Sequence, residues 1–302
     1  MIFEPQAKLL WHGDRVKEWI ESGRTSPILA EIAPTGYCNA TCPWCFFTEK
    51  HGKNKIDRKV MMQALEDLSS LGCEAVNWSG GGEPTLHPNF KDFVDKASDL
   101  GLKQGLFTHG YSPVPNQEKF AWIRISLTDK GLKKVVPPTI PFGVCINQIA
   151  EYTESDLRRI CLEAKALGAK YCQVRPALAA NYKDQAVIIP PRYLHEYEDD
   201  QFLVFITDYK YEECIKPRDY GTCYGYHFCP SIDWNGNLLV CMYMTLEKEY
   251  VLGNLNERRL KDIWKEIPKE VDVIDKCQNC CKNHEINKIL YRAKNVTEES
   301  FL

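Results

Sequence analysis

Three closely spaced cysteines restrict what this chain can fold into more than any other feature. Cys38, Cys42 and Cys45 form a CxxxCxxC run that follows the short apolar stretch 28–33. The apolar stretch predicts a β-strand, so the three cysteines are expected on one loop at its end. Three thiolates on one loop can hold three irons of a [4Fe–4S] cube and leave the fourth iron open to a small molecule.

Two other interpretations of these cysteines are a disulfide framework and a zinc site. Disulfide frameworks are typical of small secreted proteins, whereas this chain has 302 residues and no signal-peptide pattern at its start. Zinc sites usually combine a CxxC pair with a second close pair, and this triplet is unevenly spaced. No apolar run is long enough for a membrane span. We therefore expect a cytoplasmic protein with reduced thiols and no membrane partner.

A glycine-rich motif follows the second predicted strand, 74–79. Three glycines, ending in Gly81 and Gly82, precede Glu83 and a proline. Glycine lets the backbone pass close to a ligand, although a plain turn is the simpler interpretation of a lone triplet. The motif lies one βα unit after the cysteine loop, which favours a ligand site at the same edge of the sheet.

Together the two motifs resemble those of the radical S-adenosylmethionine (SAM) superfamily. In that family the open iron chelates SAM, and reductive cleavage yields methionine and a 5′-deoxyadenosyl radical that abstracts hydrogen from a substrate. The resemblance implies that Cys38, Cys42 and Cys45 hold the SAM cluster. It also implies that SAM contacts Gly81, Gly82 and Glu83 through its amino group.

The resemblance implies further SAM contacts on the loop and at later strand ends. Trp44, the aromatic residue before the third cysteine, is expected near the adenine, or else packed against the barrel. Ser126, Asn147 and Arg175 end three predicted strands, where relatives place polar residues for the SAM ribose or carboxylate. Arg175 suits the carboxylate because its guanidinium is a planar fork, and a structural ion pair is the alternative.

Strand-like and helix-like segments alternate before residue 200. Strands are predicted at 28–33, 74–79, 102–107, 122–127, 142–148 and 170–175, and helices at 57–71, 89–100 and 153–167. Thr153 and Asp156 are expected to cap the last helix and Gly168 to end it. The alternation predicts an α/β fold with a parallel sheet. Six units are too few for a full barrel, and the resemblance implies a partial (β/α)6 TIM-like barrel.

The pattern changes near residue 200, where a domain boundary is expected. A helical lead-in is predicted at 1–27, the partial barrel at 28–200, a small α+β domain at 201–290 and a tail at 291–302. Strands at 201–206 and 238–240 are assigned to the small domain, with a hairpin turn before the second.

Six cysteines lie in the C-terminal part: Cys223, Cys229, Cys241, Cys277, Cys280 and Cys281. Their spacing around Gly236 resembles SPASM and twitch domains, which carry auxiliary clusters behind a radical SAM barrel. The resemblance implies one auxiliary [4Fe–4S] cluster on Cys223, Cys241, Cys277 and Cys280, with Cys229 or Cys281 as alternative ligands. Cys229 could instead be a thiol that donates a hydrogen atom to the substrate. A zinc ribbon has similar spacing and remains an alternative.

These features predict a radical SAM enzyme that oxidises, epimerises or rearranges a polar substrate, either a peptide or a sugar-like aminocyclitol. A flavodoxin- or ferredoxin-type protein is the expected electron donor. Modification of a nucleic-acid base or nucleotide is an alternative, although the formal charge of −3 gives no electrostatic support for nucleic acid. A non-catalytic iron–sulfur or zinc protein that senses or scaffolds is the alternative of a different class.

Overall fold

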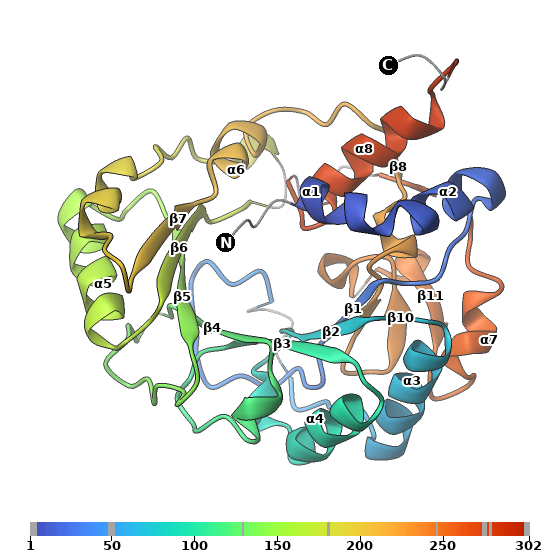
Figure 1. Cartoon of the computed structure of the whole chain (residues 1–302), viewed down its shortest axis with the longest axis horizontal. Helices are drawn as coiled ribbons and strands as arrows, with labels where there is room; N and C mark the ends of the chain where they lie inside the picture. Colours follow the sequence, from blue (N-terminus) through green and yellow to red (C-terminus); the bar gives the residue numbers. More distant parts are fainter. Residues whose placement is uncertain are drawn as a thin grey trace.

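A ten-stranded sheet organises the described part of the chain (Figure 1). The computed structural model describes residues 5–47, 52–128, 130–179, 182–245, 247–273, 277 and 280–298. The strands of the sheet follow the order β11-β10-β9-β1-β2-β3-β4-β5-β6-β7. They are β1 Leu29–Ile32, β2 Ala75–Trp78, β3 Lys103–Thr108, β4 Trp122–Ser126, β5 Phe142–Gln148, β6 Tyr171–Pro176, β7 Leu203–Ile206, β9 Ser231–Ile232, β10 Asn237–Leu239 and β11 Val251–Asn254. A separate two-stranded sheet pairs β8 Thr222–Cys223 with β12 Val271–Asp272.

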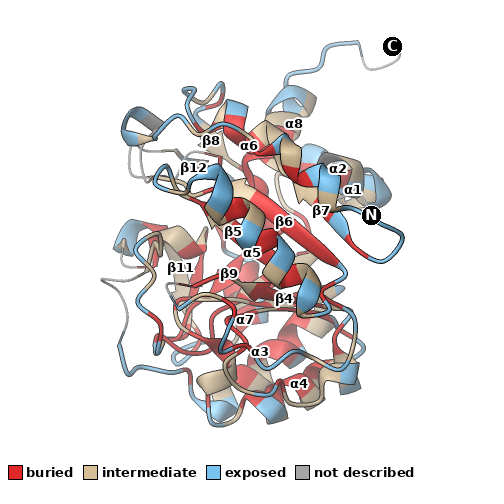
Figure 2. Ribbon diagram, turned by 90° about the vertical axis from the view of Figure 1, so that its left-hand side faces the viewer, coloured by how far each residue is buried: buried red, intermediate tan, exposed pale blue. Residues whose placement is uncertain are grey.

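Helices connect most of these strands. The α-helices are α1 Pro5–Leu9, α2 Gly13–Ser22, α3 Arg58–Ser70, α4 Phe90–Asp99, α5 Glu154–Ala166, α6 Asp208–Glu213, α7 Leu260–Trp264 and α8 His284–Lys294. Short 3-10 helices occur at Leu10–His12, Pro84–Leu86, Gln117–Lys119, Tyr182–Asp184, Arg192–Tyr197, Gly225–His227, Met242–Met244 and Lys248–Tyr250. Helices α3 and α4 pack outside the early strands, and β5 and β6 are buried along nearly their whole length (Figure 2).

The parallel sheet is longer than the six strands expected. Strands β1 to β7 pair in chain order, all parallel, so the segment assigned to the small domain as 201–206 instead extends the barrel as β7. At the other edge, β9 pairs in parallel with β1, and β10 forms an antiparallel hairpin with β9. The sheet therefore continues past the boundary expected at 200, while the α/β class and the partial barrel are confirmed.

Local sequence explains where the helices begin and end. The Asp57 side chain caps α3 by accepting the backbone N–H groups of Lys59 and Val60. Thr153 and Asp156 form the expected capping box of α5. Gly168 follows with a φ of +89°, a backbone conformation that glycine adopts without strain.

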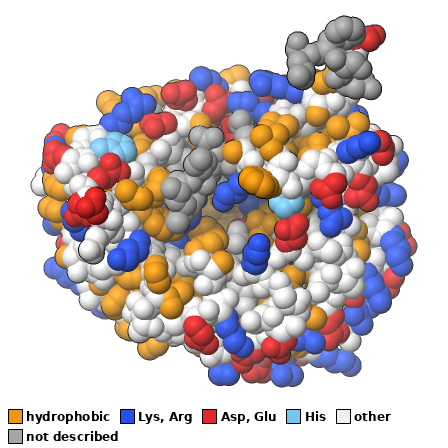
Figure 3. Space-filling view, in the orientation of Figure 1, with side chains coloured by type: hydrophobic (Ala, Val, Ile, Leu, Met, Phe, Trp, Pro, Cys, Tyr) orange, Lys and Arg blue, Asp and Glu red, His pale blue; other side chains and the backbone are white. Residues whose placement is uncertain are grey.

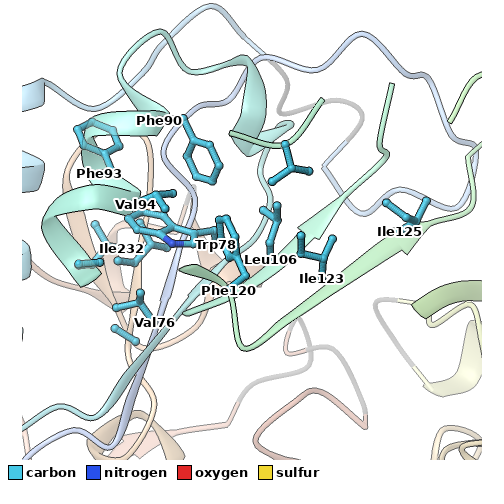
Figure 4. Packing of buried hydrophobic residues seen from close by; sticks show 14 of the residues in the cluster. Val76, Trp78, Phe90, Phe93, Val94, Leu106, Phe120, Ile123, Ile125 and Ile232 are labelled. Atoms are coloured by element: carbon cyan, nitrogen blue, oxygen red, sulfur yellow. The ribbon is translucent and has the colours of Figure 1, made fainter. Parts of the chain in front are cut away.

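The core under the first strands is aromatic. Trp78 of β2 lies edge-on to Phe90 at 5.5 Å and stacks with Phe93 at 6.3 Å, both from α4 (Figure 4). The Trp78 indole N–H donates to Gln104 at 2.8 Å, so its polar atom is satisfied inside the core. This packing fixes β2, and with it the glycine-rich motif that follows.

The two ends of the chain pack together. Leu9 and Trp19 from the lead-in form a buried cluster with Tyr224, Phe228 and Leu290. Helix α8 extends to Lys294, so the tail expected from residue 291 begins with helix. None of the helices in the described ranges combines the length and apolar character that crossing a membrane requires.

Replacing Arg259 with alanine is expected to destabilise the fold. Arg259 makes a bidentate ion pair with the buried Asp67 of α3, at 2.9 and 2.6 Å. Removing it strands a buried carboxylate at a cost of about 2 kcal/mol, moderated by water because the guanidinium is partly exposed. Urea unfolding measures the loss. Arg258→Ala, which removes only an exposed pair with Glu266, should leave the stability nearly unchanged because water screens that pair. Equal effects of the two substitutions would contradict this account.

Candidate active site

A cavity of about 440 Å³ contains most of the predicted site. It is lined by the cysteine loop, by the glycine-rich loop after β2 and by residues at or near the carboxyl ends of β3 to β7. Parallel sheets place their functional loops at this edge. Figure 3 shows the molecule hollowed near the centre of one face, with hydrophobic and cationic side chains beside the hollow.

All three cysteines of the loop after β1 line this cavity. The Cys45 N–H donates to the Cys42 carbonyl at 3.0 Å, which turns the chain and brings the cysteines to one side. Burial is the main cause that raises the pKa of Cys38. The structure describes all fourteen cysteines, and none forms a disulfide. Such a set of thiols is suited to bind a soft, positively charged metal centre.

The glycine-rich loop is held by close packing. A Cβ atom on Gly81 would overlap the ring of Trp234, and one on Gly82 would overlap the carbonyl of Tyr37. Gly82 and Glu83 donate their N–H groups to the carbonyls of Thr35 and Tyr37, at 2.9 and 2.8 Å. These contacts position the loop beside the cysteines.

Gly81→Ala is expected to displace this loop. The overlap with Trp234 should cost about 1–3 kcal/mol of stability, and the shifted backbone should weaken SAM binding. Thermal unfolding and equilibrium dialysis with SAM measure the two effects. Gly13→Ala is the matched control, because Gly13 has open space and helical backbone angles. An unchanged melting temperature in Gly81→Ala would contradict the packing argument.

Glu83 lies in the cavity wall, and its carboxylate is occupied by its own chain. Oε1 accepts hydrogen bonds from the Thr85 and Thr108 hydroxyls, both at 2.7 Å, and Oε2 accepts one from the backbone N–H of His109 at 2.8 Å. The His109 ring contacts the Asn39 side chain of the cysteine loop at 2.7 Å. Burial lowers the pKa of His109. Glu83 therefore ties the glycine loop to the end of β3.

The remaining residues predicted for SAM line the same cavity: Trp44, Ser126, Asn147 and Arg175. The Trp44 ring also lies edge-on to Tyr152 at 6.0 Å. Arg175 Nε donates to Asn147 Oδ1 at 2.8 Å, which links the ends of β6 and β5. The residues predicted for SAM binding therefore come from five segments of the chain and line one cavity.

A polar cluster in this cavity was missed by the sequence interpretation. Lys282 forms an ion pair with Glu31 of β1, and the Ser79 hydroxyl donates to Glu31 at 2.9 Å. Burial acts to raise the pKa of Glu31, but Lys282 and Ser79 outweigh it and the pKa is lowered. An acidic residue inside the apolar run 28–33 was the available signal.

A second, smaller cavity gathers four C-terminal cysteines: Cys223, Cys241, Cys277 and Cys281. Burial raises the pKa of Cys223 to about 12, and the neighbouring Cys281 and Cys277 thiols add to the effect. The thiols are therefore close enough to repel one another as thiolates, as ligands of one metal centre must be. Four cysteines suit a four-iron cluster or zinc.

Two cysteines from the predicted set lie outside both cavity linings. Cys280 is buried, and its carbonyl accepts Lys210 Nζ at 2.7 Å. Cys281, which the sequence offers as an alternative ligand, lines the smaller cavity and Cys280 does not. Cys229 is buried beside Lys282. Because Cys229 does not line the larger cavity, its placement gives no support to a role as hydrogen-atom donor.

Tyr243 lines both cavities, so the two cysteine sites share a wall. Its ring stacks on Phe47 at 6.0 Å and lies edge-on to Phe46 at 4.7 Å. Cys281 lines the smaller cavity while the next residue, Lys282, lines the larger one. The C-terminal segment thus builds part of the site.

Comparison with known families agrees with this arrangement. The sequence profile of the Radical SAM superfamily matches residues 32–131, and that of the SPASM iron–sulfur cluster-binding domain matches residues 223–282. The chain thus contains a radical SAM domain followed by a SPASM iron–sulfur cluster-binding domain. This radical SAM protein is therefore an enzyme that uses a SAM-binding [4Fe–4S] cluster and an auxiliary iron–sulfur cluster.

Relatives of this radical SAM protein differ in what they act on. An S-adenosylmethionine-dependent nucleotide dehydratase from Flammeovirga pacifica is 26% identical over 57% of this chain and 72% of its own length. Mycofactocin maturase MftC from Mycobacterium ulcerans is 30% identical over 30% of this chain and 25% of its own. The structure of Streptococcus suis SuiB bound to precursor peptide SuiA has a TM-score of 0.57 and 17% identity, covering 87% of this chain and 70% of that one.

Proposed function

We propose that this enzyme cleaves SAM in the larger cavity and abstracts a hydrogen atom from a polar substrate bound beside it. Cys38, Cys42 and Cys45 would hold the cluster, which when bound supplies the electron for cleavage. The carrying observation is that these three cysteines and the glycine-rich loop line one cavity of about 440 Å³. That volume is in the range of cavities that enclose small molecules.

The chain's own residues position SAM. Gly81 and Gly82 line the cavity and, lacking side chains, allow the loop to pack against Trp234 and Tyr37, while Glu83 fixes the loop through Thr108 and His109. Ser126 and Asn147 offer hydrogen-bonding groups on the facing strands, and Trp44 offers an apolar surface for the adenine.

We infer that the auxiliary cluster is held by Cys223, Cys241, Cys277 and Cys281. A cluster bound by these residues would supply an electron acceptor behind the wall that Tyr243 forms between the cavities. This arrangement favours oxidation over epimerisation, because Cys229 does not line the substrate cavity. A flavodoxin- or ferredoxin-type donor would supply the electron for SAM cleavage.

The substrate is proposed to be a small polar molecule, with a nucleotide favoured over a peptide or an aminocyclitol. The relative from Flammeovirga pacifica is named a nucleotide dehydratase and is matched over 72% of its length. A dehydration leaves the overall oxidation state of the substrate unchanged. The comparison therefore supports a nucleotide as substrate and gives no support to oxidation as the reaction.

Anaerobic incubation of the reconstituted, dithionite-reduced enzyme with SAM tests the function. We expect 5′-deoxyadenosine and methionine in equal amounts, measured by chromatography with mass detection. A fully loaded, reduced protein that forms neither product, with or without a panel of nucleotides, would favour a sensing or scaffold role.

A further inference from the structure

The larger cavity contains more positive than negative side chains. Among the residues that the structure describes, its lining includes four cations, Arg124, Arg175, Lys210 and Lys282, against two carboxylates, Glu31 and Glu83. Burying a charge is costly unless an opposite charge or strong hydrogen bonds compensate it. Each cation therefore needs a partner.

Two of the four cations are compensated within the chain. Lys282 is neutralised by its ion pair with Glu31. The Arg124 guanidinium lies over the rings of Phe107 and Trp122, both at 5.2 Å, and donates to the Tyr171 hydroxyl at 3.2 Å. Stacking on aromatic faces stabilises a buried guanidinium.

Arg175 and Lys210 form no ion pair with the described residues, although the Lys210 ammonium lies 5.6 Å from the centre of the Tyr209 ring. Arg175 hydrogen-bonds only the neutral Asn147 amide, and Lys210 hydrogen-bonds only the Cys280 carbonyl. The two cations are close enough for Arg175 to lower the pKa of Lys210, after burial, which is the larger cause. Glu31 is close enough to Arg175 to act on its pKa, but that carboxylate is already paired with Lys282. Neighbouring cations that outnumber the carboxylates around them form a site for an anion, and a guanidinium fork suits phosphate or carboxylate.

SAM and its cluster do not supply the missing charge. SAM carries one carboxylate against a sulfonium and an ammonium group. Its single net positive charge offsets the single net negative charge of a doubly charged [4Fe–4S] core on three thiolates. The excess positive charge of the lining thus persists when both are bound.

We propose that the substrate carries an anionic group, a phosphate or a carboxylate, which Arg175 and Lys210 bind in the larger cavity. This inference rests on the proposed function and names the chemical class of its substrate. A hydrogen bond to the Cys280 carbonyl orients the Lys210 ammonium, and a hydrogen bond to Asn147 orients the Arg175 guanidinium. Pairing with both would neutralise the cavity and fix one end of the substrate relative to SAM.

Binding of small anions to the reconstituted, SAM-saturated enzyme tests this inference. Pyrophosphate and succinate serve as probes, measured by calorimetry under anaerobic conditions. The wild-type enzyme is expected to bind at least one probe, and Arg175→Gln and Lys210→Met to weaken that binding by about tenfold each. Preference for pyrophosphate indicates a phosphate-bearing substrate, and preference for succinate indicates a carboxylate. Arg175→Lys, which retains the charge and loses the fork, should fall between wild type and Arg175→Gln.

Matched controls separate this site from other anion sites. Arg192→Gln removes an exposed arginine that pairs with Asp208 and does not line the cavity, and it should bind the probe like the wild type. Equal probe binding by wild type and Arg175→Gln would overturn the inference. So would a loss of SAM affinity with unchanged probe affinity, because Arg175 would then bind the SAM carboxylate.

The two proposals can fail separately. Wild-type enzyme that forms 5′-deoxyadenosine but binds neither probe overturns the anionic substrate and leaves the radical reaction standing. Wild-type protein that forms no 5′-deoxyadenosine overturns the proposed function, whatever the probes do.

Discussion

Replacing Cys38, Cys42 and Cys45 together with alanine is expected to abolish 5′-deoxyadenosine formation. The three thiols are the only cysteines among the residues lining the larger cavity in the part of the chain that the structure describes. Without them no iron can be held beside SAM, so the electron for cleavage has no route to it. The expected loss is at least about a thousandfold, measured by product formation under dithionite.

Iron content distinguishes this effect from general misfolding. The triple variant should retain about four irons per chain, because the second cysteine set is intact. Cys161→Ala is the matched control, since Cys161 is buried on α5 and lines neither cavity. It should retain all the iron and form product at the wild-type rate. Product formation by the triple variant at the wild-type level would refute the proposed role of the cysteine loop.

Cys281→Ala is expected to remove the auxiliary cluster, while Cys280→Ala is expected to retain it. Cys281 lines the smaller cavity with three other cysteines, whereas Cys280 does not line it. Loss of one of four ligands should lower the iron content by up to about four per chain and abolish the corresponding electron paramagnetic resonance signal. 5′-Deoxyadenosine formation without substrate depends on the other cluster and should persist.

The neighbouring substitution provides the control for this prediction. Cys280→Ala removes a buried thiol of the same size, so any general disturbance of the segment should affect both variants. Iron loss in Cys280→Ala with retention in Cys281→Ala would reverse the assignment and restore the ligand set expected from the sequence. Retention of all iron in both variants would show that neither thiol is required.

The sequence was sufficient to predict the strands and the cysteine loop because both depend on local patterns. Apolar runs between glycines gave β1 to β6 to within two residues at each end. Strand β7 was recognised as a strand but assigned to the wrong part, because its apolar run does not reveal that β6 is its neighbour. Pairing between distant segments is a tertiary property that periodicity does not contain.

The choice between Cys280 and Cys281 also lies beyond local patterns. Adjacent cysteines have the same spacing relative to Cys277 to within one residue, so motif spacing does not separate them. Cys280 has a φ of +53°, a left-handed conformation that turns the chain. Only the folded backbone determines which thiol reaches the smaller cavity.

The ion pair between Glu31 and Lys282 shows the same limit. The two residues are separated by 251 positions in sequence, and neither belongs to a motif. They meet because β9 pairs with β1 and brings the C-terminal segment against the barrel. Arg175 and Lys210 likewise lie together in one cavity only because the fold brings their segments to the same edge of the sheet.

Electron paramagnetic resonance of the anaerobically reconstituted, reduced enzyme, with and without SAM, tests the two-cluster radical account most directly. Iron and sulfide counting on the same sample should give about eight of each per chain. We expect two overlapping signals from reduced [4Fe–4S] clusters, of which SAM changes only one. A single cluster, or two signals that SAM leaves unchanged, would contradict the account.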